Sequence, residues 1–406
     1  MELIQGGVCA SKGFLAGAVH CGVRKSQSKL DLAVIYSKKP CAAAAVYTTN
    51  QVKADCLKLT KEHLSNGKAQ AIICNSGNAN ACAPFGKENA LKEAIVCAKL
   101  TQLDTEDVIV ASTGVIGQTL PIEAIEQGAM QIELKENNSL EAAQAIMTTD
   151  TKTKSCAVSF ELDGIRVHLG GICKGSGMIH PNMGTMLAFI TSDVDIESSM
   201  LEKALQEITK KTFNRISVDG DTSTNDTVTV MCVVLANGMA KNKPIQTEGE
   251  AYDTFKKALH TVMENLAIQI ASDGEGASRL LSVTVYDAQS EEQAEKLAKS
   301  VASSTLFKAA MFGSDANWGR VLCAMGYSQA AFDPEIVDVT FATKFGKIQV
   351  CQSGKALDFD EEQAKKILKT DSVQVLIDLH QGDEVVTCWG CDLTYDYVKI
   401  NGDYRT

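Results

Sequence analysis

The residues best suited to chemistry lie in residues 174–191, where a glycine-rich loop meets a short apolar run. Glycines and Pro181 favour a loop, because glycine tolerates positive φ and proline cannot continue a helix. Residues 186–190 are apolar, which predicts a buried strand. Thr185 stands at the junction directly after Gly184, so a hydroxyl nucleophile follows a residue that has no side chain.

This Gly-Thr pair has the chemistry for cleavage of the backbone by the chain itself. The hydroxyl of Thr185 would attack the carbonyl of Gly184, move the acyl group from nitrogen to oxygen, and lose it to water. The new chain would begin at Thr185, whose free α-amine, with a pKa of about 8, would act as its general base. Taken alone the pair is a weak signal, because most such pairs are ordinary junctions between a loop and a strand.

The surrounding motif strengthens this interpretation. Residues 177–187, GMIHPNMGTML, resemble the self-cleavage motif of the ornithine acetyltransferase family, the glutamate N-acetyltransferases of arginine biosynthesis. The family usually has alanine before the nucleophile, whereas this chain has Gly184. Glycine is smaller still, so cleavage is expected here too. Further blocks resemble the family in order along nearly the whole chain: residues 45–50, 75–80, 111–117, 147–151, 219–226, 315–320 and 395–406.

The resemblance implies which residues carry the reaction. Thr185 would be the nucleophile, and the hydroxyl of Thr113 and the backbone N–H of Gly114 would stabilise the oxyanion. The residues implied in substrate binding are Thr148, Lys174, Thr185, Glu275, Asn401 and Thr406, with Thr151 as an alternative to Thr148. Lys174 would hold the α-carboxylate of an amino acid as a point cation, and Glu275 would hold the cationic side chain of ornithine.

Each of these residues also has an ordinary structural interpretation. Residues 112–114 alone would be a turn after a strand, and Lys174 and Glu275 would be solvated loop charges. The C-terminal residues 401–406 would be frayed, as chain ends usually are.

The predicted function is transfer of acetyl from N-acetylornithine to glutamate through an acetyl-Thr185 intermediate. The chain would split into residues 1–184 and 185–406, and two copies of each would assemble. No cofactor is required, and acetyl-CoA would be a second acetyl donor if the enzyme is bifunctional. Two alternatives stay open: an N-terminal-nucleophile amidase or aminopeptidase of related fold, and a non-catalytic binding or assembly subunit.

Composition narrows the class of protein. The chain has 406 residues, 45% hydrophobic and 22% charged, which is ordinary for a globular protein. Its net charge of −11 argues against binding of nucleic acid, which depends on clustered Lys and Arg. No apolar run approaches the roughly 20 residues that span a bilayer. The N-terminus lacks the basic residues of a signal peptide, so the expected location is the cytoplasm.

The fourteen cysteines are scattered through apolar runs, which predicts buried free thiols. Cys388 and Cys391 form a C-x-x-C, but residues 392–400 read as β-rich rather than as the helix that a redox motif requires. We therefore predict two buried cysteines at a strand edge. No histidine or second C-x-x-C lies at zinc spacing, so no metal site is predicted.

The pattern of elements predicts an α/β fold, a layered sandwich of mixed or antiparallel sheets between helices. The resemblance implies the N-terminal-nucleophile-like architecture of this family, with the nucleophile strand central. The expected strands include residues 30–36, 42–49, 71–74, 106–111, 186–190, 281–285, 337–341 and 373–379, with a hairpin of 158–161 and 165–169. Helices are expected at 87–100, after Pro121, at 140–147, from Tyr252, and from Ser290.

Overall fold

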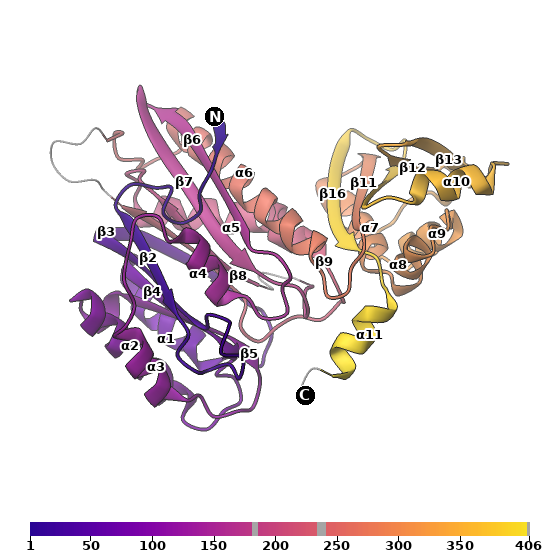
Figure 1. Cartoon of the computed structure of the whole chain (residues 1–406). Helices are drawn as coiled ribbons and strands as arrows, with labels where there is room; N and C mark the ends of the chain where they lie inside the picture. The colour runs from indigo at the N-terminus through magenta and orange to yellow at the C-terminus, as the bar shows by residue number, and fades with distance from the viewer. Residues whose placement is uncertain (181–185, 234–240, 404–406) are drawn as a thin grey trace. The chain divides into compact units, whose positions relative to one another are not determined.

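The computed structural model describes residues 1–180, 186–233 and 241–403 and divides the chain into two compact units (Figure 1). The first unit comprises Met1–Gly175, Pro181–Asn214 and Thr222–Ala267. The second unit comprises Ser176–His180, Arg215–Asp221 and Ile268–Thr406. Each unit has its own sheet, so each is described by itself.

The sheet of the first unit has nine strands and mixed pairing. The strands pair in the order β1-β6-β7-β8-β10-β3-β4-β5, and β2 pairs with β3. Their bounds are β1 Glu2–Ile4, β2 Phe14–Val19, β3 Leu32–Tyr47, β4 Lys68–Asn78, β5 Val108–Val115, β6 Lys154–Leu162, β7 Ile165–Lys174, β8 Leu187–Ser192 and β10 Thr227–Val233. Strand β8 lies between two strands: it is antiparallel to β7 and parallel to β10. The strand that follows the predicted nucleophile is therefore internal to the sheet, as expected.

Helices cover both faces of this sheet. The first-unit helices are α1 Asp55–His63, α2 Gly86–Thr101, α3 Ile122–Ala129, α4 Ser139–Ile146 and α5 Ser198–Lys211. Side chains of β3 alternate between two cores: Leu32 and Val34 pack with residues of α1, α2 and α3. Ala33 and Ile35 pack with residues of α4. This alternation follows the two-residue period of a strand and confirms the predicted layered architecture.

One predicted pair of strands is a single strand. Residues 30–36 and 42–49 were expected to be separate, but β3 runs from Leu32 to Tyr47 through Pro40. Proline is tolerated because β3 changes partner there, pairing with β2 up to Ser37 and with β10 from Cys41. The register with β4 also shifts between Tyr36 and Cys41. Pro40 thus occupies an irregular stretch where its missing N–H leaves no ladder bond unmade.

The second unit is a seven-stranded sheet packed against helices. The order is β14-β13-β12-β15-β11-β16-β9. Its strands are β9 Ile216–Ser217, β11 Leu280–Ala288, β12 Asp338–Thr343, β13 Gly346–Gln352, β14 Lys355–Ala356, β15 Ser372–Asp378 and β16 Glu384–Cys391. Its helices are α7 Glu291–Ser303, α8 Thr305–Phe312, α9 Trp318–Gly326, α10 Glu361–Leu368 and α11 Tyr395–Gly402. One core joins residues of α7, α8, α9 and α10 to the sheet.

Several local predictions are confirmed. The β6–β7 hairpin turns at Asp163 and Gly164, whose positive φ values of 52° and 75° suit a two-residue turn. Helix α6, Glu250–Ser272, contains the helix expected from Tyr252. It buries an apolar stripe that includes Phe255, Leu259 and Leu266, and it contributes residues to both units. Helix α7 begins after Ser290, as expected, and the Ser290 hydroxyl caps it by accepting from the Gln293 N–H.

The prediction after the C-x-x-C is wrong. Residues 392–400 were expected to be β-rich, but α11 begins at Tyr395. Cys388 and Cys391 lie inside β16, not at the start of that helix, and both are buried. Burial raises the pKa of the Cys388 thiol to about 12 and also raises the pKa of Cys391. A thiolate is therefore disfavoured at both positions, which argues against a redox role. The reason is burial of the two thiols, not the β-rich continuation that was predicted.

No helix in the described ranges is long and apolar enough to cross a membrane.

Candidate active site

The predicted oxyanion pair lies at the end of β5, against the end of β4. These strands are parallel, and Ser76 pairs with Thr113 and Gly77 with Gly114. Gly114 has φ +136°, and a Cβ there would lie 2.5 Å from the backbone nitrogen of Asn78. Only glycine fits this position, because both the dihedral angle and the space exclude a side chain.

Lys174 lies beside Thr113, although 61 residues separate them in the sequence. It is the last residue of β7 and is only 7% exposed. Its Nζ is 3.5 Å from the Thr113 Oγ1. The alternative interpretation of Lys174 as a solvated loop charge is therefore wrong. Its buried ammonium group lies next to the Thr113 hydroxyl.

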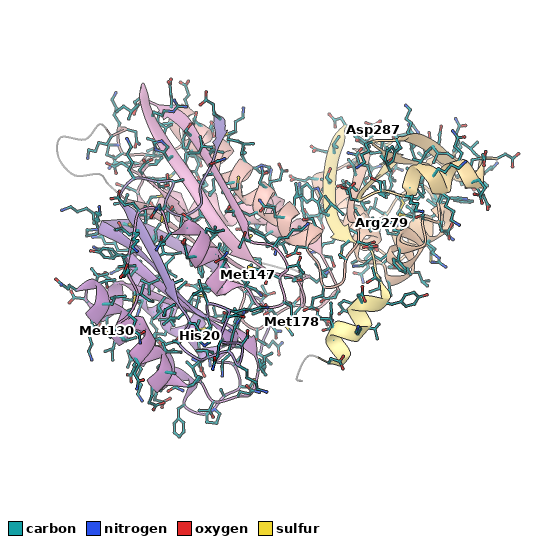
Figure 2. The ribbon with its side chains drawn as sticks, in the orientation of Figure 1. His20, Met130, Met147, Met178, Arg279 and Asp287 are labelled. Carbon is teal, nitrogen blue, oxygen red and sulfur yellow. The ribbon has the colours of Figure 1, made fainter. Side chains whose placement is uncertain are left out.

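Asp150 connects the two predicted substrate residues Thr148 and Lys174. Its carboxylate accepts from the backbone N–H of Thr148 at 2.9 Å and from the N–H of Gly175, next to Lys174, at 2.7 Å. It also accepts from the Lys154 ammonium at 2.7 Å. Met147, labelled in Figure 2, directly follows α4 and leads into this turn.

The charge on Asp150 is stabilised by its surroundings. Burial alone would raise its pKa, but the Lys174 and Lys154 ammonium groups and the hydrogen bonds outweigh burial and lower it. Asp150 is therefore an anion that fixes the Thr148 turn and the end of β7. Thr151 is exposed whereas Thr148 is partly buried, so Thr148 is the better candidate of the two.

The predicted nucleophile falls outside the described residues, as does Gly184. The residue that follows it, Met186, is 3% exposed, and its carbonyl accepts from the Thr227 N–H of β10 at 2.8 Å. Lys174 of β7 and Thr227 of β10 both pair with Leu187, the first residue of β8. Lys174 and Thr227 therefore flank the start of the strand into which Thr185 leads.

Glu275 and Asn401 come together within the second unit. Glu275 is 7% exposed, its N–H donates to the Ser176 carbonyl at 2.9 Å, and its carboxylate accepts from Asn401 Nδ2 at 2.7 Å. Gly177 has no side chain because a Cβ there would clash with the Glu275 carboxylate. Met178, labelled in Figure 2, follows with its N–H bonded to Asp219. Thr406 lies outside the described residues.

The structure thus gathers the predicted residues into two groups. Thr113, Gly114, Thr148 and Lys174 belong to the first unit, and Glu275 and Asn401 belong to the second. Within each group a buried carboxylate, Asp150 or Glu275, organises the polar contacts.

Comparison with known proteins decides the family. A model of the ArgJ family matches residues 15–406. The chain belongs to the ArgJ family. Membership confirms the resemblance predicted from the motifs and the prediction that the chain is an enzyme.

Relatives in this family align along the whole chain. The arginine biosynthesis bifunctional protein ArgJ 1 of Clostridium acetobutylicum is 50% identical over 397 residues, covering 97% of this chain and 96% of that protein. The ArgJ of Caldanaerobacter subterraneus subsp. tengcongensis is 47% identical over 409 residues, covering 100% of both. The crystal structure of the ArgJ from Bacillus halodurans is 44% identical with a TM-score of 0.48, covering 54% of this chain and 99% of that one.

Sequence reasoning missed Asp150 in this ArgJ-family chain. It lies inside the block 147–151 that carried part of the resemblance, but no role was predicted for it. Lys154, four residues later, would have indicated an ion pair only if both residues were known to be buried, because buried acids and lysines are almost always paired. Nothing in the sequence marks either residue as buried.

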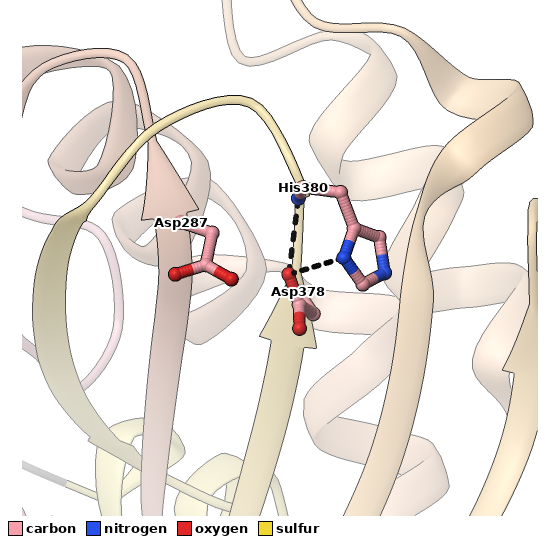
Figure 3. A group of neighbouring side chains, drawn as sticks. All are labelled: Asp287, Asp378 and His380. Atoms are coloured by element: carbon pink, nitrogen blue, oxygen red, sulfur yellow. Dashed lines mark hydrogen bonds and ion pairs between the residues drawn. The ribbon is translucent and has the colours of Figure 1, made fainter.

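A second missed group lies in the second unit. Figure 3 shows Asp287, Asp378 and His380, whose ligand atoms lie within 4.8 Å of one another. His380 Nδ1 is 3.3 Å from Asp378, and its Nε2 is 3.2 Å from Asp338. The imidazole is exposed and faces a carboxylate on each side. Hydrogen bonds of His380 with Asp378 and Asp338 account for this arrangement, and we assign it no metal.

Proposed function

We propose that this chain is a glutamate N-acetyltransferase that takes acetyl from N-acetylornithine onto Thr185 and passes it to glutamate. The observation that carries the proposal is the buried pair of Lys174 and Thr113 beside the start of β8, in a chain of the ArgJ family. That pair combines a cation for the substrate carboxylate with a donor for an oxyanion.

In the first half-reaction the hydroxyl of Thr185 attacks the acetyl carbonyl of N-acetylornithine. The Oγ–C bond forms while the hydroxyl proton moves to the α-amine of Thr185. The Thr113 hydroxyl and the Gly114 N–H donate to the oxyanion. The C–N bond then breaks, and the α-amine returns its proton to the nitrogen of the departing ornithine.

In the second half-reaction the amine of glutamate attacks acetyl-Thr185. A new C–N bond forms, the Oγ–C bond breaks, and the amine proton is delivered through the α-amine to Oγ. Lys174 holds the α-carboxylate of each substrate in turn, with Thr148 alongside. Glu275, Asn401 and Thr406 are also substrate-binding residues in this proposal, with Glu275 as the partner of the ornithine ammonium group.

The active form arises by cleavage between Gly184 and Thr185. Residues 1–184 and 185–406 then stay associated, because the fold interleaves them: β8 and β10 of the second fragment pair with β7 and β3 of the first. Two copies of each fragment assemble in the cytoplasm. Acetyl-CoA is a second acetyl donor if the enzyme is bifunctional, as its relatives are named, and no other cofactor is needed.

The test is the intact mass under denaturing conditions, before and after mixing with N-acetylornithine. The expected result is two fragments that meet at Gly184/Thr185, of which the second gains one acetyl group. Thr185→Ala should remain a single chain that gains nothing. A wild-type chain that stays whole and gains nothing would overturn the proposal. Acetate release without glutamate-dependent transfer would instead favour an N-terminal-nucleophile hydrolase.

A further inference from the structure

Two motif blocks have no part in the chemistry above, and one side chain joins them. Residues 75–80 end β4 and lead out of it, and residues 219–226 lead into β10. Asn225, in the second block, is 5% exposed. Its Nδ2 donates to the Ala79 carbonyl at 2.6 Å and to the Ser112 carbonyl at 2.8 Å.

Both N–H donors of the Asn225 amide are used, and its oxygen accepts a hydrogen bond. Its nitrogen has two hydrogens and both are donated, and its Oδ1 accepts from the Thr224 hydroxyl at 2.6 Å. A buried amide in this state is held in one orientation, because any rotation leaves a buried polar group unpaired. Asn225 therefore makes a rigid connection.

The two residues that accept these bonds, Ser112 and Ala79, are connected to opposite ends of the oxyanion pair. Ser112 directly precedes Thr113, so the bonded carbonyl belongs to the peptide that carries the Thr113 N–H. The Ala79 N–H donates to the carbonyl of Val115, directly after Gly114, at 3.0 Å. Asn225 thus holds the Thr113–Gly114 segment from the residue before it, and through Ala79 from the residue after it.

The backbone of Asn225 is tied to the start of β8. Two residues later, the Thr227 N–H donates to the Met186 carbonyl at 2.8 Å, and Thr227 pairs with Leu187. The loop is held on both sides of Asn225, since the carbonyls of Thr224 and Asp226 accept from the N–H groups of Ala54 and Thr48.

We propose that Asn225 is a positioning residue that fixes the oxyanion donors, Thr113 and Gly114, relative to the start of the nucleophile strand β8. This inference rests on the proposed function, in which Thr185 precedes that strand. The separation of nucleophile and oxyanion donors decides how well the tetrahedral intermediate is stabilised, and a displacement of about 1 Å costs roughly a hundredfold in rate.

The chain offers a matched control in Asn242. It is 1% exposed and lies in the same unit. Its Nδ2 donates to the carbonyls of Asp195 at 3.0 Å and Lys243 at 2.7 Å, and its Oδ1 accepts from the Asp195 N–H at 2.8 Å. Asn242→Ala therefore removes a comparable set of hydrogen bonds, two donated to carbonyls and one accepted, but its partners carry no proposed role.

The experiment compares wild type, Asn225→Ala, Asn225→Asp and Asn242→Ala by thermal denaturation, by acetyl-transfer kinetics, and by the NMR signal of a labelled Thr113 methyl group. Both alanine variants should lower the melting temperature similarly. Asn225→Ala should lower kcat by about a hundredfold with KM within about threefold, whereas Asn242→Ala should leave kcat within about threefold. Asn225→Asp keeps the size of the side chain but replaces the NH2 group, which donates two bonds, with an oxygen that can only accept. It should therefore lower kcat at least as much as Asn225→Ala.

The Thr113 signal separates the two proposals. It should shift in both Asn225 variants and stay in place in Asn242→Ala, whether or not acetyl transfer occurs. If wild type transfers no acetyl but the signal shifts as expected, the proposed function fails and the positional link stands. If the signal and kcat of Asn225→Ala match those of Asn242→Ala, the positioning role is overturned.

Discussion

Asp150 and Lys154 form an ion pair at 2.7 Å in which the side chains are 0% and 1% exposed. Removing one partner of a buried ion pair typically costs about 3–5 kcal/mol. We expect Asp150→Asn to lower the free energy of unfolding by that order, measured by urea denaturation. The variant should also raise KM, because Asp150 holds the Thr148 and Gly175 backbone.

A surface pair at the same spacing serves as the control. Glu292 and Lys296 are also four residues apart, at 2.6 Å, but 76% and 47% exposed. Glu292→Gln should leave stability and kinetics nearly unchanged, because solvent screens an exposed pair. If both variants lose an equally small free energy of unfolding, the Asp150–Lys154 pair does not stabilise the fold.

The role of Thr113 is tested by Thr113→Ala together with Thr113→Ser. Loss of one oxyanion donor typically costs about 3–4 kcal/mol of transition-state stabilisation. Self-cleavage and turnover should therefore fall at least tenfold in the alanine variant, by steady-state kinetics and by the rate of chain splitting. The serine variant keeps the hydroxyl and should recover most of the activity. Unchanged rates in Thr113→Ala would remove it from the mechanism.

Gly114 is tested against Gly117, a nearby glycine that also has a positive φ. Gly114→Ala places a methyl group 2.5 Å from the Asn78 nitrogen at φ +136°, so strand β5 must move. Gly117 has φ +81° with nothing within 4 Å, so Gly117→Ala pays only the dihedral cost, about 1–2 kcal/mol. We expect Gly114→Ala to be the less stable variant in urea denaturation and to lose activity, while Gly117→Ala retains it. Equal effects would mean that the close approach to β4 is unimportant.

The sequence predicts elements well where local rules coincide with burial. The Asp163-Gly164 turn and the stripe of α6 are examples, because turn chemistry and helical period act over a few residues. The sequence predicts elements poorly where contacts with residues distant in the chain determine the local structure. Pro40 reads as a strand break until the change of partner along β3 is known. Tyr395 and Tyr397 favour a strand by propensity, yet they lie in α11, from which Asn401 bonds Glu275.

The same limit applies to the site. Thr113 and Lys174 could be proposed only because their motifs resemble a family, since no local pattern relates residues 61 positions apart. Asp150 and Asn225 stood inside recognised blocks but had no predicted role. Their importance lies in backbone groups that they bond across the sheet, and these contacts exist only once the register of β5, β7 and β10 is formed.

His180 should make the second unit sensitive to acid. Burial, and then the nearby Lys299, lower its pKa from 6.5 to about 4. Between those pH values the unfolded chain binds a proton that the folded chain does not, so stability falls as pH decreases from about 6.5 to about 4. We expect the urea midpoint of wild type to drop between pH 7 and pH 5. His180→Asn cannot bind that proton, so its drop should be smaller, and an identical drop would contradict the assignment.

Glu275 should determine how well the cationic substrate binds. Glu275 is 7% exposed, and Oε2 of its carboxylate accepts a hydrogen bond from Asn401 Nδ2 at 2.7 Å. An ornithine ammonium group would balance the negative charge of the Glu275 carboxylate. Glu275→Gln keeps the shape and the Asn401 contact through its amide oxygen, so the fold should be unaffected. We expect KM for N-acetylornithine to rise at least tenfold, the factor that corresponds to about 1.4 kcal/mol. KM for glutamate, which has no such cation, should change much less. If both values rise together, Glu275 acts on the shape of the site rather than on the ornithine side chain.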